Sequence, residues 1–318
     1  MKEVSVIIPC YNCAALVKET LDSLASQTFQ DFEVVCVNDG STDETLSVLE
    51  QWKVKNAVQM QIISKPNGGV SSARNAGIQA AKGKYLLFLD ADDLYHPEFI
   101  QRLLDAMTQS GADVAYCWLN RSEEILSVQY QTIPEVKQSQ QEAMYNLLYR
   151  MADVGFYCYL YRKDKILQEN LEFDVNTRRF EDREFNWKYL CHCQSAVLVD
   201  APLYYYRVTA NSATQKKTVR WRTDGLDAVI RIEKYLEEKE CDFLPEVKNY
   251  LFPRVMWAMA KNYALGGAKD AFERLGKEYD VKACMRRTSK DSNKLVALAS
   301  RCYLIHPNLF YFALRLKK

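Results

Sequence analysis

"KYLLFLDADDLY", residues 84–95, joins a run of five apolar residues to a cluster of three carboxylates. The run Tyr85–Leu89 shows no period-two alternation, which is typical of a strand buried on both faces in a parallel sheet. Asp90, Asp92 and Asp93 follow it at once. Clustered carboxylates repel one another unless solvent or a positive group compensates them. The stretch therefore predicts a buried strand that ends in either a solvated turn or a cation site.

Strand-like and helix-like stretches alternate through the first hundred residues. We expect strands at 4–9, 32–39, 60–64 and 85–90, and helices within 14–27, 40–52 and 67–83. Ser41 and Glu44 have the spacing of a capping box, and Val70, Ala73 and Gly77 share one predicted helix face. Alternating strands and helices predict a parallel sheet with right-handed crossovers, close to a Rossmann arrangement.

Polar residues follow the predicted strands. They stand at 9–12, 38–40, 65–69 and 90–93. Because binding sites of such sheets lie beyond the carboxyl ends of the strands, these residues are expected to line one crevice. The carboxylates after residue 89 would form one wall of it.

The pattern changes after residue 100. We expect strands at 113–119, 155–162 and 202–208, and helices at 141–152 and 181–193. The helix at 141–152 carries Met144, Leu147, Leu148 and Met151 on one stripe. From about residue 216 the chain reads as amphipathic helices, with breaks at Pro245, Pro253 and Gly266-Gly267.

Composition sets broad limits on the function. The 318 residues are 48% hydrophobic, carry a formal charge of +1 and include ten cysteines. This balance gives no electrostatic signature for nucleic acid, and the cysteines do not form a disulfide-scaffold pattern. Met1-Lys2-Glu3 leads directly into a strand-like stretch rather than a secretory leader. We therefore expect a reduced, cytoplasmic protein.

The near-neutral charge conceals a basic tail. Residues 281–318 hold nine basic residues and one acid, a net charge of +8 that leaves −7 for the remainder. One interpretation is a helical cap with a solvated basic face. The other, which we favour, is peripheral contact with anionic lipid on the cytoplasmic face of the plasma membrane, where each Lys or Arg contributes about 1 kcal/mol.

Two common phosphate-binding motifs are absent. No G-x-G-x-x-G follows the first strand. The stretch from Gly77 to Tyr85 departs from the P-loop, because five residues instead of four separate its glycines and Tyr85 replaces the final Ser or Thr. A metal-bridged nucleotide fits better, because Mg²⁺ uses one or two carboxylates plus substrate phosphates. Asp90 and Asp92 could supply the carboxylates, and Asp39 could accept a base N–H. Arg74, one turn into a helix whose N-terminus favours anions, could meet a phosphate.

Five ordered blocks make the sequence resemble a known family. They are "VSVIIPCYN", "VNDGSTDET", "NGGVSSARNAGI", "GKYLLFLDADD" and "EDREF". In order and spacing they are similar to the inverting glycosyltransferases of family 2, of the bacterial surface-polysaccharide type, across residues 3–210. A lone D-x-D would be weak evidence, whereas five blocks in order are strong.

The resemblance implies a fold and a division of the chain. The fold is GT-A, a Rossmann-like, mostly parallel α/β sheet flanked by helices, with a C-terminal helical extension. Residues 1–100 would form the nucleotide-sugar-binding half, residues 101–215 the acceptor and catalytic half, and residues 216–318 the extension with its basic tail.

The resemblance also implies site residues. Pro9, Tyr11, Asn12, Asp39, Asn67, Arg74 and Asp90 would bind the nucleotide-sugar, Asp92 would ligate Mg²⁺ or Mn²⁺, and Asp182 would be the general base. The donor would be a UDP-sugar and the acceptor a hydroxyl of a glycan or a polyprenyl-linked lipid. Some relatives place a histidine after the strand that matches "YYYR"; its absence here leaves a third metal contact in doubt.

Other interpretations remain. Glu181 and Asp182 could be ordinary first-turn acids favoured by a helix dipole. A nucleotidyltransferase would carry a basic activation motif in the first glycine-rich turn, which "PCYNCAA" lacks. A non-catalytic binding or scaffold protein would have lost the D-x-D or the base carboxylate, and both are present.

Overall fold

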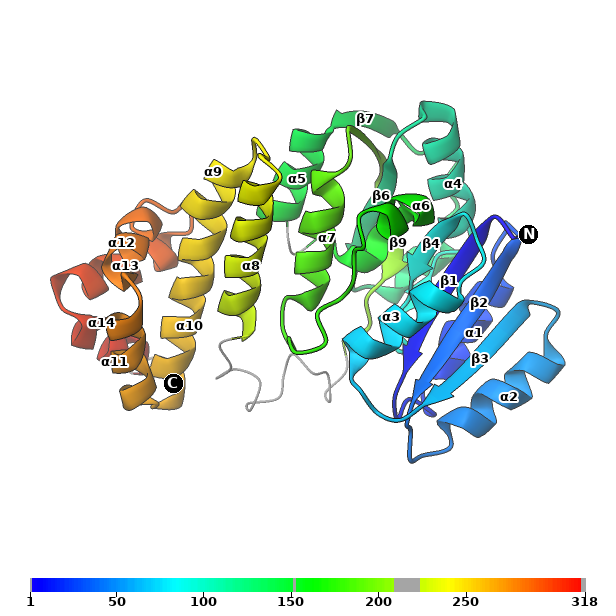
Figure 1. The fold of residues 1–318 in the computed structure, drawn as a ribbon, viewed down its shortest axis with the longest axis horizontal. Coiled ribbons are helices and arrows are strands. Elements are labelled where there is room, and N and C mark those ends of the chain that lie inside the picture. Colours follow the sequence, from blue (N-terminus) through cyan, green and yellow to red (C-terminus); the bar gives the residue numbers. More distant parts are fainter. Residues whose placement is uncertain (1, 151–152, 209–223, 316–318) are drawn as a thin grey trace. The chain divides into compact units, whose positions relative to one another are not determined.

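The computed structural model describes residues 2–150, 153–208 and 224–315. The chain forms two compact units, which we describe separately (Figure 1). The first comprises residues 1–177 and 181–208, and the second comprises residues 178–180 and 209–318.

Four parallel strands form the N-terminal half of the sheet in the first unit, in the order β3-β2-β1-β4. They are β1 (Val4–Cys10), β2 (Phe32–Asp39), β3 (Gln59–Lys65) and β4 (Tyr85–Phe88). All of β2 and β4 is buried, as expected of strands covered on both faces. The predicted strands are confirmed, and β1 and β4 form a topological switch point.

Right-handed crossovers place the helices of this half. The chain moves from β1 to β2 to β3 in one direction, so α1 (Val17–Ala25) and α2 (Thr45–Lys55) cover one face. It then returns to β4 beyond β1, so α3 (Val70–Ala80) covers the other face and packs on β1 and β2 (Figure 1). A Cβ on Gly77 would lie 2.3 Å from Ile7 Cγ2; glycine is needed for this close approach.

The second half of the sheet is mixed. β8 (Tyr159–Arg162) is antiparallel to β4 and β6, and β6 (Val114–Asn120) is parallel to β9 (Ser195–Tyr205). Two short strands, β5 (Leu94–Tyr95) and β7 (Glu135–Ser139), pair with β9. The helices are α4 (Phe99–Ser110), α5 (Gln140–Tyr149), α6 (Lys163–Gln168) and α7 (Glu181–Cys191), with 3₁₀ turns at Glu123–Ser127 and Phe156–Cys158.

Some local expectations were wrong. Ser41 and Glu44 form no capping box, because α2 begins at Thr45 and the Ser41 hydroxyl instead accepts the Asn12 N–H at 3.1 Å. Val70 is 39% exposed rather than on the packed face of α3. β9 begins seven residues before its predicted start at 202. The predicted stripe residue Met151 lies outside the described residues.

The second unit is helical in its described part. Its helices are α8 (Asp224–Glu238), α9 (Leu244–Glu246), a π segment (Val247–Leu251), α10 (Phe252–Gly266), α11 (Lys269–Glu278), α12 (Val281–Thr288), α13 (Lys294–Ile305) and α14 (Pro307–Arg315). Phe272, Tyr303 and Phe310 meet in its core. Across the described ranges, no helix has the length and apolar character required to cross a bilayer.

Of the predicted breaks in this unit, one is wrong. Pro253 stands near the start of α10, directly after the π segment, and the helical path continues through it. The π segment changes the hydrogen-bond pattern just before Pro253, and such local changes accommodate a residue that lacks an amide hydrogen. Gly267, at φ +77°, ends α10 as expected.

Candidate functional site

The switch point gathers the predicted site residues of the first hundred positions. Asn12 follows β1, Asp39 ends β2, and Asp90 follows β4. Parallel strands end at one edge, and the neighbouring strands β1 and β4 diverge there to opposite-facing crossovers, which opens a crevice in this class of sheet. The edge predicted from the sequence is therefore present.

Asp39 organises one wall of this edge. Its side chain is 3% exposed and receives Lys65 Nζ at 2.6 Å, the Gly68 amide at 3.0 Å and the Gly69 amide at 2.8 Å. Asn67 Nδ2 donates to the Asp39 carbonyl oxygen at 2.9 Å. The Gly68 amide also lies 3.2 Å from the second carboxylate oxygen, so the turn after β3 is fixed on this buried carboxylate.

The loop after β1 forms a second wall. Asn12 has φ +48°, in the left-handed region that asparagine tolerates. Its Oδ1 accepts the Thr42 N–H at 2.8 Å, which ties this loop to the loop after β2. Tyr11 is 54% exposed, and Pro9 is half-buried. An exposed tyrosine beside an ordered loop offers an aromatic face to a ligand.

Arg74 connects the end of β4 to the start of α7. Its side chain is 5% exposed, and its guanidinium contacts Asp90 Oδ1 at 3.0 Å and Glu181 Oε1 at 3.3 Å. The guanidinium carbon lies 4.2 Å from the Phe156 ring centroid and 5.3 Å from that of Phe173. Burial acts to lower the pKa of Arg74, but the neighbouring carboxylates raise it. Arg74 thus remains a cation held among acids.

Glu181 and Asp182 occupy the first turn of α7. Burial and the charge of Asp182 raise the pKa of Glu181 to about 7, against the opposing effect of Arg74. The charge of Asp182 also acts on Arg74. The structure therefore brings the predicted base carboxylate into the same electrostatic cluster as Arg74 and Asp90, although these residues are far apart in sequence.

The remaining carboxylates of the D-x-D stretch differ in their surroundings. Asp93 is buried, accepts the Tyr204 hydroxyl at 2.7 Å and the Arg207 amide at 2.8 Å, and has a pKa raised by burial to about 8. Asp92 is half-buried, and burial and the charge of Asp90 raise its pKa. Among the described residues Asp92 has no hydrogen-bonding partner except its own amide. Asp93 is thus tied into the fold, whereas the Asp92 carboxylate accepts no hydrogen bond from another described residue.

The donor set at Asp92 suits a hard cation shared with a phosphate ligand. Within the described ranges no group of three or more His, Cys, Asp or Glu side chains could enclose a metal alone. The charge of Asp90 repels Asp92 and that of Arg207 compensates it only in part, so a divalent cation would stabilise this carboxylate. Mg²⁺ commonly takes one or two carboxylates and completes its shell with water and substrate phosphates, so the residues fit such an ion.

Comparison with known sequences decides the family. The sequence profile of glycosyl transferase family 2 matches residues 5–170, slightly more than half of the chain. The chain belongs to glycosyltransferase family 2. A related protein, the uncharacterized glycosyltransferase EpsJ of Bacillus subtilis strain 168, is 32% identical over 222 residues, which are 67% of this chain. The matched stretch spans 63% of the length of EpsJ.

Solved structures show the same fold. TarS of Staphylococcus aureus, residues 1–349 in complex with UDP, has a TM-score of 0.63 at 20% identity, covering 98% of this chain and 90% of that one. A mannosyltransferase from Pyrobaculum calidifontis, in complex with GDP-Man and Mn²⁺, has a TM-score of 0.54 at 16% identity, covering 99% and 86%. The GT-A fold expected of a family 2 glycosyltransferase is thus confirmed.

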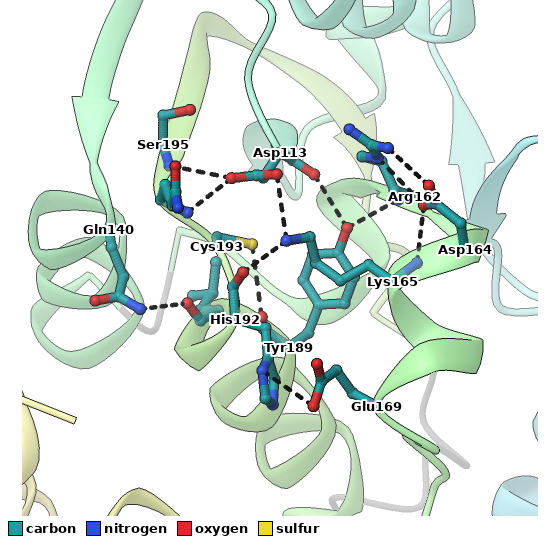
Figure 2. A network of polar contacts seen from close by, with 12 residues as sticks. Asp113, Gln140, Arg162, Asp164, Lys165, Glu169, Tyr189, His192, Cys193 and Ser195 are labelled. Atoms are coloured by element: carbon teal, nitrogen blue, oxygen red, sulfur yellow. Dashed lines mark hydrogen bonds and ion pairs between the residues drawn. The ribbon is translucent and has the colours of Figure 1, made fainter. Parts of the chain in front are cut away.

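A polar network holds the other end of α7 in this family 2 chain (Figure 2). Lys165 Nζ donates to the His192 carbonyl at 2.6 Å and pairs with Asp113 at 3.2 Å. Gln140 Nε2 donates to the Cys191 carbonyl at 2.8 Å, and the Tyr189 hydroxyl donates to the Asp113 carbonyl at 3.0 Å. Cations at a helix C-terminus stabilise the exposed carbonyls. With Arg74 at its start, α7 is fixed at both ends.

Sequence reasoning missed several residues that the structure places around the candidate site. Glu181 was considered only as a first-turn acid, although its place beside Asp182 in "EDREF" was a usable signal. Lys65 was seen only as part of a polar strand end. Phe156 and Phe173, which flank Arg74, gave no signal, because aromatic residues in apolar stretches usually indicate packing alone.

Proposed function

We propose that the protein transfers a sugar from a UDP-sugar to a hydroxyl of a glycan or polyprenyl-linked acceptor, with inversion, in cell-surface polysaccharide synthesis. The observation that carries this proposal is the carboxylate cluster around Arg74 at the switch point, which joins Asp90 and Glu181 directly. Related proteins in the same family include one named for poly(ribitol-phosphate) N-acetylglucosamine transfer, TarS.

Local charge explains why a divalent cation belongs in this proposal. Asp90, Asp92 and Asp182 outnumber Arg74 and Arg207, the cations whose charges act on these carboxylates. A diphosphate is itself anionic, so the site would repel the donor unless a cation lay between them. Asp92 would hold Mg²⁺ or Mn²⁺ there. When bound, the metal supplies stabilisation of the charge that develops on the leaving diphosphate.

The residues of the chain divide the remaining work. Asp39 and Asn67 would hold the base, with Pro9, Tyr11 and Asn12 lining that pocket, and Asp90 would face the ribose and phosphates. Arg74 contacts Asp90 and would add positive charge beside the phosphates. Asp182 would take the proton of the acceptor hydroxyl as it attacks the anomeric carbon. One in-line displacement needs no carboxylate nucleophile, unlike a retaining glycosidase.

The division of the chain follows from these roles. Residues 1–100 would bind the donor, residues 101–215 would place the acceptor and the base, and residues 216–318 would extend the enzyme. A nucleotide-sugar donor and a polyprenyl-linked acceptor would both be accessible on the cytoplasmic side of the plasma membrane. We therefore propose that the protein acts in the cytoplasm.

A turnover screen tests the proposal. Release of nucleoside diphosphate from a panel of UDP-, GDP- and dTDP-sugars is measured with Mn²⁺, with and without glycan or lipid-linked acceptors. We expect one UDP-sugar to be turned over in an acceptor-dependent way, and Asp182→Asn to lose at least 100-fold in rate while still binding UDP. Binding of UDP without turnover of any sugar nucleotide would instead favour a non-catalytic binding protein.

A further inference from the structure

An uncovered apolar face lies on α13 in the second unit. Val296, Ser300 and Tyr303 are buried against the unit's core. The opposite side carries Leu295, Leu298 and Ile305, which are 62%, 60% and 77% exposed. Positions 295, 298 and 305 share one helix face, because three- and seven-residue steps return to the same side. The helix is thus apolar on two faces, of which the protein covers one.

The next helix continues this feature. α14 buries Phe310 and Tyr311 and leaves Leu309 and Phe312 49% and 51% exposed. α13 and α14 pack against each other. We call Leu295, Leu298, Ile305, Leu309 and Phe312 the α13–α14 outer set. Single exposed apolar side chains are ordinary. Several of them on neighbouring helices indicate a surface that a membrane or another molecule covers.

Charge indicates what covers the set. Lys294 and Arg301 are exposed on α13, seven positions apart, and Arg315 is exposed at the end of α14. Residues 292–318 contain no acidic residue. A second copy of the chain would bring the same positive charges to the contact and would be repelled. An anionic surface would be attracted, and an amphipathic helix rich in Lys, Arg, Leu and Phe is suited to a lipid interface.

We infer that the α13–α14 outer set is a peripheral docking surface for anionic lipid. The inference is independent of the proposed transfer reaction. The sequence predicted a lipid contact anywhere in residues 281–318. The structure limits this contact to α13 and α14, because α12 buries Val281, Cys284 and Met285 in the core of the unit. The apolar side chains enter the headgroup boundary, while Lys294 and Arg301 remain beside the lipid phosphates. Because the number of apolar side chains is small, binding is reversible.

Vesicle flotation of the full chain tests the inference. The probes are neutral vesicles of phosphatidylcholine alone and anionic vesicles that also contain roughly 30–40% phosphatidylglycerol. We expect the wild type to float with the anionic vesicles only, and the double variant Leu298→Glu/Ile305→Glu to bind at least tenfold more weakly. Arg301→Glu, a second variant on the same helix, is expected to lose binding about fivefold. Val54→Glu is the matched control: Val54 is 87% exposed on α2, and its replacement should leave binding unchanged.

Other outcomes would overturn the inference. One is failure of the wild type to bind anionic vesicles at low salt. A second is equal binding of the wild type and the double variant, with circular dichroism showing both folded. A third is a wild type that sediments as a dimer or larger assembly and a double variant that sediments as a monomer, with vesicle binding equal in both; the outer set would then be an interface between copies of the chain.

Discussion

At the scale of single residues, the chemistry of the site depends on how Arg74 is shared. Its guanidinium contacts Asp90 and Glu181, which lie 16 and 107 residues away in the sequence. Two aromatic rings flank it, and its side chain is 5% exposed. A planar fork suits two carboxylates on different elements better than a lysine ammonium would. The arrangement orients the Asp90 and Glu181 carboxylates, which come from two different elements.

The raised pKa of Glu181 predicts a pH-dependent stability. Its pKa is about 7 in the folded protein, compared with about 4.3 in an unfolded chain. Between these values the folded state holds the extra proton, so stability falls as pH rises from about 4.3 to 7. Glu181→Gln removes this titration. The unfolding free energy of the variant relative to wild type should rise over that window, by at most about 1.4 kcal/mol per pH unit.

Chemical unfolding of both proteins at pH 5 and pH 7 checks this prediction. Glu273→Gln is a suitable control, because Glu273 is half exposed and pairs only loosely with Lys269 at 3.7 Å. Parallel pH dependences for wild type and Glu181→Gln would show that Glu181 does not titrate in this range.

The positions of individual site residues were predictable where a polar residue followed a clear strand pattern. Asp90, Asp92 and Asp39 were expected at strand ends from local pattern alone. The pairing of Arg74 with Glu181 was not, because it joins residues whose proximity depends on the whole sheet. Nor could the sequence distinguish Asp93 from Asp92, since what separates them is burial against Tyr204.

At the scale of elements, α7 carries Asp182 and is held at both ends. Arg74 holds its first residue, and the network around Lys165 holds its last carbonyls (Figure 2). Precise placement of a general base matters, since small displacements of a reacting group lower the rate strongly. The network is therefore expected to affect the reaction although none of its members lies at the switch point.

Lys165→Met tests this role. The change leaves the Asp113 carboxylate with fewer partners and removes a cation from the end of α7, which should cost about 1–3 kcal/mol of stability. We expect turnover to fall severalfold while the affinity for UDP stays near the wild-type value. Lys234→Met, at a position 75% exposed on α8, is the control. A loss of UDP affinity equal to the loss of turnover would contradict a role through α7 alone.

The elements themselves were largely predictable in the first hundred residues. β1, β2 and β3 and the helices between them follow strong apolar periods and glycine-rich turns. The later strands were harder, because β8 starts only at Tyr159 after a 3₁₀ turn and β9 continues through Pro202 with a register shift against β6. Such irregular pairing is set by tertiary packing, which a local pattern does not contain.

At the scale of the whole molecule, the chain has two units with separate cores. The core of the helical unit includes Phe310, fully buried and in ring contact with Phe272 and Tyr303. Every residue assigned to the nucleotide site belongs to the other unit. Damage to the helical core should therefore lower stability without removing the donor site.

Phe310→Ala tests this separation. The cavity it leaves should cost about 3–5 kcal/mol, seen as a lower midpoint for thermal unfolding of the helical unit. UDP binding is measured at about 10–15 °C, where protein stability is typically near its maximum. The affinity of the variant should stay within about twofold of wild type. Phe312→Ala, which truncates a half-exposed ring on the same helix, should change the midpoint little. Abolished UDP binding in folded Phe310→Ala would mean that the donor site depends on the helical unit.

We propose that Asp92 and the neighbouring carboxylates bind a nucleoside diphosphate through a divalent cation. Calorimetric titration of UDP, with and without Mn²⁺, on wild type and Asp92→Asn tests it most directly. We expect wild type to bind UDP at least tenfold more tightly with Mn²⁺ than without, and Asp92→Asn to lose that gain while its fold, by circular dichroism, is unchanged. Equal UDP affinity with and without Mn²⁺, or a metal-dependent gain that survives in Asp92→Asn, would show that Asp92 does not hold a cation that binds UDP.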